Sequence, residues 1–210
     1  AVLMHYGDTV VLSTATASDK PREGIDFFPL SVEYNEKLYA VGKIPGGFNK
    51  REGKASENAV LTCRVIDRPM RPLFPKDYRN DVTLENLVLS VEQDCSPELT
   101  AMLGSAIATA ISDIPFDGPT ASTQVGLVDG ELVFNPTAEQ KEKSDLALTV
   151  ASTKEKVIMI EAGANEVPED KMIEAIFAAH EVNQKVIAFI DQIVAECGKP
   201  KHDYVSFAVP

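Results

Sequence analysis

The sequence has few cysteines and few histidines, and neither residue type is clustered. It contains only three of each, all far apart: Cys63, Cys95, Cys197, His5, His180 and His202. No CxxC pair occurs, and a disulfide framework or a structural zinc site would need closely spaced, matched residues. The sequence therefore argues against both kinds of site. This cysteine usage suits a reducing compartment, so we expect a cytoplasmic protein.

Long apolar runs and nucleotide-binding glycine motifs are also missing. No segment approaches the roughly 18 apolar residues that a membrane span requires, so we expect no membrane partner. Neither GxxxxGK[ST] nor GxGxxG occurs, and no serine lies in the strand–turn–helix context of a nucleophile elbow. The remaining composition, with 44% hydrophobic and 25% charged residues in 210, is that of an ordinary globular chain.

One stretch, residues 43–79, differs in charge from the rest of the chain. It contains nine basic and four acidic residues, a net charge of +5, whereas the whole chain carries −12. A basic island in an acidic protein indicates either a surface for a polyanion or arginines paired with acidic groups at a contact. Composition alone leaves both interpretations open.

Residue patterns predict an α+β fold with helices on one face of a mixed sheet. Strands are expected at 2–6, 9–17, 27–34, 38–42, 82–92, 123–128, 131–134, 146–152 and 157–161. Gly7-Asp8 and Asp129-Gly130 predict hairpin turns between the strands that flank them. Helices are expected from Ser56, from Ser96-Pro97 and over 168–197, because capping residues precede apolar positions at helical spacing. The apolar stripe of the third helix includes Ile173 and Phe177, and Gly198 is expected to end that helix. The small residues Gly104, Ser105 and Ala108 suit close approach of the second helix to another backbone.

A glycine-rich loop within the basic stretch places one aromatic side chain among cations. Phe48 stands beside Lys50, Arg51 and Lys54, with no apolar neighbours in the loop to bury it. Single-stranded nucleic acid is bound by such groups, because bases stack on aromatic rings while cations follow the phosphates. The alternative is a surface loop whose Phe48 tucks under the domain.

Three arginines follow at helical spacing and could lie along one side of the first helix. Arg64, Arg68 and Arg71 could clamp phosphates, since guanidinium groups bind them in a bidentate manner. The alternative is a set of ion pairs with Asp67 and other acidic residues.

Other candidate residues are better explained as structural. Glu139 and Asp145 lie near one hairpin and could gather a divalent ion, but a solvated face is the more frequent role of such residues. His180 falls on the apolar stripe of the long helix, where a satisfied core or interface histidine is expected. The residues therefore predict no catalytic group and no metal ligand.

Taken together, the motifs resemble the bacterial polynucleotide phosphorylases over essentially the whole chain. The resemblance rests on PGGFNKREGKASE and LTCRVIDRPMRPLFP, supported by GDTVVLSTATA, GIDFFPLSVEYNEKLYAVGKIPG, SDIPFDGP, KSDLALTVAST, EAGANEVPED and AECGKP. It implies the first of that family's two ribonuclease PH-like cores, the fold shared with the second domain of ribosomal protein S5. The chain opens directly in strand-like sequence, so we expect residues 1–200 to be this core without its opening strands. Residues 201–210 are expected to begin a linker to a helical domain.

The resemblance also implies an activity. The family forms homotrimeric rings that degrade RNA from the 3′ end, with inorganic phosphate as co-substrate, and release nucleoside diphosphates. Mg²⁺ and the phosphate pocket belong to the second core, and degradosome-type partners are an RNA helicase or an endoribonuclease. A Phe-Phe-Arg-Arg-type loop lines the RNA entrance of the first core, and here it reads Phe48-Asn49-Lys50-Arg51. The expected role is to guide single-stranded RNA and build the ring; the alternatives are a catalytically silent RNA-binding scaffold or a free-standing ribonuclease PH relative.

Overall fold

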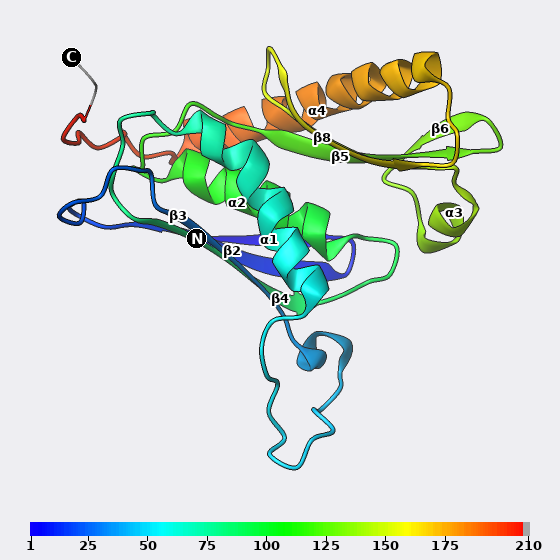
Figure 1. Cartoon of the computed structure of the whole chain (residues 1–210), viewed down its shortest axis with the longest axis horizontal. Helices are drawn as coiled ribbons and strands as arrows, with labels where there is room; N and C mark the ends of the chain where they lie inside the picture. The colour runs from blue at the N-terminus through cyan, green and yellow to red at the C-terminus, as the bar shows by residue number, and fades with distance from the viewer. Residues whose placement is uncertain (208–210) are drawn as a thin grey trace.

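The computed structural model describes residues 1–207, which form alternating layers of sheet and helix. A first sheet, a middle layer with helices α1 (Glu57–Met70) and α2 (Pro97–Ile111), a second sheet and an outer helix α4 (Glu169–Cys197) follow one another across the molecule (Figure 1). The expected α+β fold with helices packed on a mixed sheet is confirmed. The strands are divided between two sheets, of which only the first is mixed.

The first sheet has the strand order β1-β2-β4-β3, with β1 (Val2–Tyr6), β2 (Thr9–Ala17), β3 (Leu30–Glu36) and β4 (Val82–Ser90). The expected hairpin of β1 and β2 is confirmed, and Gly7 supplies its turn with a positive φ of 56°. Strand β3 runs parallel to β4. The strand predicted over 38–42 is wrong: Leu38–Val41 is a 3₁₀ helix, η1, ended by Gly42 at φ 67°.

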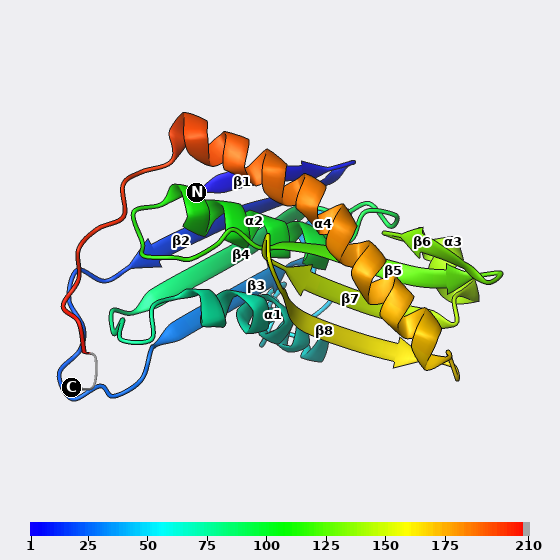
Figure 2. The ribbon, with the colours of Figure 1, turned by 90° about the horizontal axis from the view of Figure 1, so that it is seen from above.

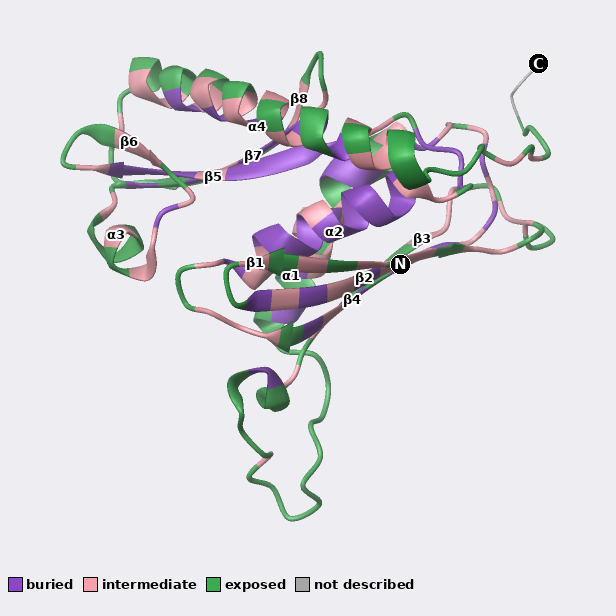
Figure 3. Ribbon diagram, turned by 180° about the vertical axis from the view of Figure 1, so that it is seen from behind, coloured by how far each residue is buried: buried purple, intermediate pink, exposed green. Residues whose placement is uncertain are grey.

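The middle-layer helices begin where the sequence predicted them. Ser56 and Ser96 cap α1 and α2, each accepting a hydrogen bond from the backbone N–H three residues later. Helix α1 continues through Pro69 into a short 3₁₀ turn, η2 (Arg71–Leu73). Helix α2 is buried almost all round and contacts both sheets, as Figure 3 shows for its central turns.

The second sheet is fully antiparallel, in the order β6-β5-β7-β8. Its strands are β5 (Ala121–Val128), β6 (Glu131–Phe134), β7 (Leu146–Ser152) and β8 (Val157–Ala164). The predicted Asp129-Gly130 turn is confirmed, with both residues at positive φ, as a type I′ hairpin requires. A short helix that the sequence analysis missed, α3 (Ala138–Lys143), begins with a capping box of Thr137 and Gln140.

Helix α4 crosses the outer face of the second sheet (Figure 2). Its fully buried Asn183 accepts a hydrogen bond from Thr123 Oγ1 (2.7 Å) and donates to Ser152 Oγ (2.9 Å) and the Val150 carbonyl (3.2 Å). Ile173 and Phe177, which were expected on the buried stripe, are exposed. His180 is half-buried and contacts Gln184, in keeping with a satisfied structural histidine. None of the described helices is long and apolar enough to cross a membrane.

Residues 199–206 return to the middle layer after α4, and we call this segment the strap. The Lys201 ammonium donates to the carbonyls of Thr109, Ala110 and Ser112 at the end of α2, at 3.2, 2.9 and 2.7 Å. The Lys199 N–H donates to the remaining carbonyl, of Ile111. The strap therefore caps the C-terminus of α2. Of the predicted linker 201–210, residues 208–210 lie outside the described part of the chain.

Tyr78 lies beneath the strap in an aromatic cluster. Its buried ring meets Tyr204 edge-on at 5.0 Å, and its hydroxyl contacts His202 Nε2 at 3.2 Å. Burial, reinforced by nearby Asp113, raises the pKa of Tyr78 to about 12. Burial also raises the pKa of Tyr34, which donates to Glu36 at 2.7 Å.

We predict that folding becomes pH-dependent in this alkaline range. The unfolded chain releases the Tyr78 proton near pH 10, its ordinary value, whereas the folded chain retains it to about pH 12. The stabilising contribution is thus complete below pH 10 and is lost as the pH rises to 12. An absorbance titration of tyrosinate should show Tyr78 and Tyr34 ionising above the ordinary range of tyrosine. In Tyr78→Phe one of the late ionisations should disappear; a titration unchanged by this substitution would contradict the assignment.

Candidate nucleic-acid interface

Residues 42–56, which we call the arm, project from the body between η1 and α1 (Figure 1). Nearly the whole arm is exposed (Figure 3). Phe48 is exposed to 102% of its reference area. The alternative in which Phe48 tucks under the domain is therefore wrong. Its ring is available to stack on a flat partner.

The predicted RNA-binding side chains of the arm lie together on this projection. Asn49, Lys50, Arg51 and Lys54 are all exposed. The Lys50 N–H donates to the Gly47 carbonyl at 3.0 Å, and Lys50 adopts a left-handed φ of 50°, so a tight turn presents the Phe48 region. At the base of the arm, the Leu38 N–H donates to Glu52 Oε1 at 2.8 Å. The arm is thus anchored to η1 while its tip stays free of the body.

The three arginines of the first helix have different environments. Arg71 forms a bidentate pair with Asp67 (2.6 and 2.9 Å) and donates to the Phe28 and Leu30 carbonyls, both at 3.2 Å. The last two of these bonds fix the entry into β3 and the first two form an ion pair within α1, so Arg71 matches the structural alternative.

Arg68 and Arg64 make fewer hydrogen bonds than Arg71. Arg68 Nη1 lies 2.7 Å from Glu161 Oε2 on β8, and Arg68 Nη2 donates to the Ile160 carbonyl at 3.3 Å. Arg64 is exposed and makes no side-chain hydrogen bond or ion pair within residues 1–207. Together they flank a hollow of about 360 Å³ between α1 and β3, which is lined by Val32, Cys63, Arg64, Asp67 and Arg68.

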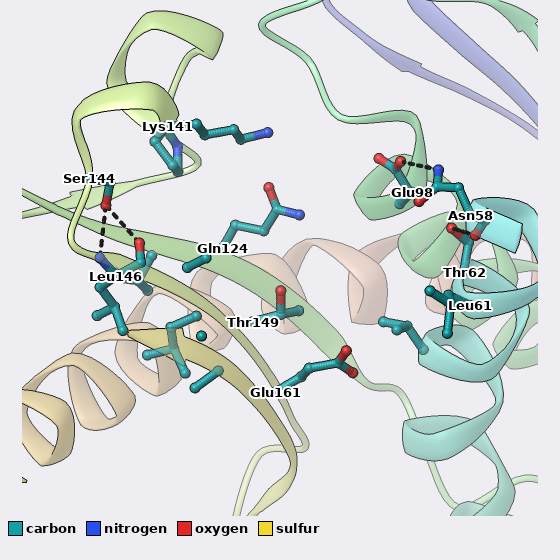
Figure 4. A pocket seen from close by; sticks show the side chains of 17 residues that line it. Asn58, Leu61, Thr62, Glu98, Gln124, Lys141, Ser144, Leu146, Thr149 and Glu161 are labelled. Atoms are coloured by element: carbon teal, nitrogen blue, oxygen red, sulfur yellow. Dashed lines mark hydrogen bonds between the residues drawn. The ribbon is translucent and has the colours of Figure 1, made fainter. Parts of the chain in front are cut away.

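A second hollow, a cavity of about 560 Å³, lies between the middle helices and the second sheet. Figure 4 shows Gln124 and Thr149 pointing into it from the sheet, Lys141 reaching over it from α3, and Glu98 and Asn58 across from them. Glu98 accepts hydrogen bonds from Ser96 Oγ (2.7 Å) and more weakly from Asn58 Nδ2 (3.4 Å). The sequence analysis missed this cavity because its walls come from segments as far apart as α1 and β8.

The residues described here do not fit a resident Mg²⁺ ion. Glu139 is paired with Lys143 at 2.6 Å, and Asp145 stands exposed just before β7. Within residues 1–207 no three His, Cys, Asp or Glu side chains gather into a group that could hold a metal. The carboxylates at the cavity, Glu98 and Glu161, already bind neighbouring donors. No chemical step in this chain is therefore assigned to a metal.

Comparison with known protein families shows to which class this fold belongs. Residues 1–115 match the model of the 3′ exoribonuclease family, domain 1 (RNase_PH), and residues 118–182 match domain 2 of the same family. The chain therefore belongs to the 3′ exoribonuclease family. In fold it resembles rice (Oryza sativa) Rrp46, with a TM-score of 0.73 over 91% of this chain and 86% of that one, at 13% identity.

Among curated proteins, the chain is similar to polyribonucleotide nucleotidyltransferases. It is 86% identical over all 210 residues to the enzyme of Lachnoclostridium phytofermentans and 61% identical over 199 residues to that of Clostridioides difficile. It spans 30% and 28% of their lengths, respectively. The predicted resemblance to the first core of these enzymes is confirmed.

Proposed function

We propose that this chain is the RNA-guiding first core of a cytoplasmic 3′→5′ phosphorolytic exoribonuclease. The whole enzyme would act in RNA processing and mRNA degradation, using inorganic phosphate to release nucleoside diphosphates. It would form a homotrimeric ring, contact a degradosome-type helicase or endoribonuclease, and hold its Mg²⁺ in the second core. Identity of 86% to a polyribonucleotide nucleotidyltransferase favours this function over that of a free-standing ribonuclease PH relative.

The observation that carries the proposal is the arm. The Phe48 ring is fully exposed and makes no contact with the body, and exposed cations surround it. Stacking of a base on an aromatic ring contributes about 1–3 kcal/mol, and the cations add attraction to the phosphates. Single-stranded RNA, whose bases are free to stack, satisfies both features.

A second candidate function, a catalytically silent scaffold for RNA and for the ring, is favoured by one observation. The carboxylates of residues 1–207 do not gather into a metal-binding group, and those at the 560 Å³ cavity bind protein donors. Phosphorolysis needs charge neutralisation at the reacting phosphate. We therefore expect the isolated chain to bind RNA without cleaving it.

Binding of a short fluorescent single-stranded RNA at several salt concentrations tests the proposal. The Phe48→Ala/Lys50→Ala/Arg51→Ala variant should lose affinity by about tenfold or more at low salt, because it removes one stacking platform and two cations. Nucleoside diphosphate release with added phosphate is followed in the same tubes, and none is expected from this chain alone.

The matched control removes one aromatic ring and two cations elsewhere on the surface. Phe177 on α4, together with Lys156 and Lys185, is exposed, and alanine at all three positions should leave RNA affinity almost unchanged. Equal affinity of the arm variant and the wild type would refute the assignment of the arm. Phosphate-dependent release by a pure preparation would refute the silent function.

A further inference from the structure

We propose that the hollow between α1 and β3 binds one phosphodiester of the RNA through Arg64 and Arg68, and that Glu161 competes with the RNA for Arg68. This inference rests on the proposed function, because it names the subsite next to the arm and the contact that regulates it.

The charges around the hollow favour an anion. Asp67 is neutralised by its two bonds from Arg71. Burial raises the pKa of the Cys63 thiol, which therefore stays neutral at physiological pH. Arg64 and Arg68 are the cations that remain, one helical turn apart on the same side of α1. Side chains at this spacing are neighbours, about 5–6 Å apart at Cβ, so one phosphate can bridge the two guanidinium groups.

The pair between Arg68 and Glu161 is exposed and therefore easily exchanged. The side chains of the two residues keep 48% and 52% of their accessible area, and the contact closes at 2.7 Å. Exposed ion pairs are weak, since solvent and salt screen them. Arg68 also donates to the Ile160 carbonyl at 3.3 Å, so two of its five N–H groups hold β8.

The position of Glu161 on β8 allows it to compete with the RNA for Arg68. Its carboxylate faces α1 from β8 and also lines the 560 Å³ cavity, as Figure 4 shows. When a phosphate binds Arg68, the Glu161 side chain is released toward the cavity and its solvent. The ion pair between Arg68 and Glu161 thus opposes RNA binding by the free energy of one exposed contact.

The test compares Glu161→Gln with Glu139→Gln in the RNA-binding measurement. Each substitution removes one negative charge from an exposed ion pair, Glu139 being paired with Lys143 on α3, so the change in net charge is the same. Glu161→Gln is expected to bind RNA about two- to fivefold more tightly than Glu139→Gln, the value of one exposed ion pair.

A third variant shows whether Arg68 carries the effect. Adding Arg68→Met to Glu161→Gln should abolish the gain in affinity, and thermal unfolding of each variant confirms that the chain is folded. Equal affinities of Glu161→Gln and Glu139→Gln, or a gain that survives Arg68→Met, would overturn the competition while leaving the proposed function intact. Absence of RNA binding by every protein, the wild type included, would overturn the proposed function and the inference together.

Discussion

Replacing Gly104 by valine is expected to lower the free energy of unfolding by about 3 kcal/mol, because α2 rests directly on β2 at this residue. A Cβ at Gly104 would lie 2.2 Å from Ser13 Oγ and 2.9 Å from Ser13 Cβ. Ser13 cannot give way without loss, since its hydroxyl donates to the buried Asn86 Oδ1 at 2.6 Å, and Ser105 donates to the same atom at 2.9 Å. The helix would have to move away from the sheet and open this network.

Urea denaturation followed by circular dichroism measures this loss. The control is Gly163→Val on the exposed part of β8, where no atom lies within 4 Å of the added Cβ and a β-branched residue suits a strand. It should change the free energy of unfolding by less than about 0.5 kcal/mol. A loss in Gly104→Val as small as that in Gly163→Val would mean that the first sheet tolerates displacement of α2.

The second large effect is expected from Asn183→Ala, again about 3 kcal/mol of the free energy of unfolding. Asn183 has no accessible surface, and its amide satisfies Thr123, Ser152 and the Val150 carbonyl. Alanine leaves these buried polar groups without their partner and opens a cavity between α4 and the second sheet.

The same denaturation experiment with Asn165→Ala provides the comparison. Asn165 is exposed and uses only its backbone N–H, which donates to the Asp145 carbonyl at 2.9 Å, so its side chain is dispensable. Hydrogen exchange should show faster exchange in α4 and β7 of the Asn183 variant. Retained protection there, with little loss of stability, would show that apolar packing alone docks α4.

The parts of the fold that local patterns encode were predicted from the sequence. Helix α2 was predicted from Ser96-Pro97 and from apolar residues at helical spacing. Its small residues predicted a close approach to another backbone, and Gly104 makes that contact. The Asp129-Gly130 hairpin followed from turn chemistry, and the end of α4 followed from Gly198.

The parts that were not predicted had weak or competing local signals, or depended on contacts between distant segments. The segment 38–42 has strand-like residues, but Gly42 at positive φ and the bonds to Leu38 close it into a 3₁₀ turn. Helix α3 was missed because its six residues are polar and carry no apolar stripe. Likewise, spacing alone could not separate Arg71, which binds carbonyls of the segment that enters β3, from Arg64, which stays unpaired within the described residues.

The order in which the chain is synthesised gives the strap a further consequence. Lys201 lies 92 residues after Thr109, whose carbonyl it binds, and Tyr204 lies 127 residues after its partner Asp77. At about 5–20 residues per second, a ribosome needs roughly 5–20 s to add the segment between Thr109 and Lys201. Throughout that interval the last carbonyls of α2 have no strap to bind, and Tyr78 lies uncovered. This end of α2 therefore stays open to chaperones and proteases in a nascent chain until the strap has been made.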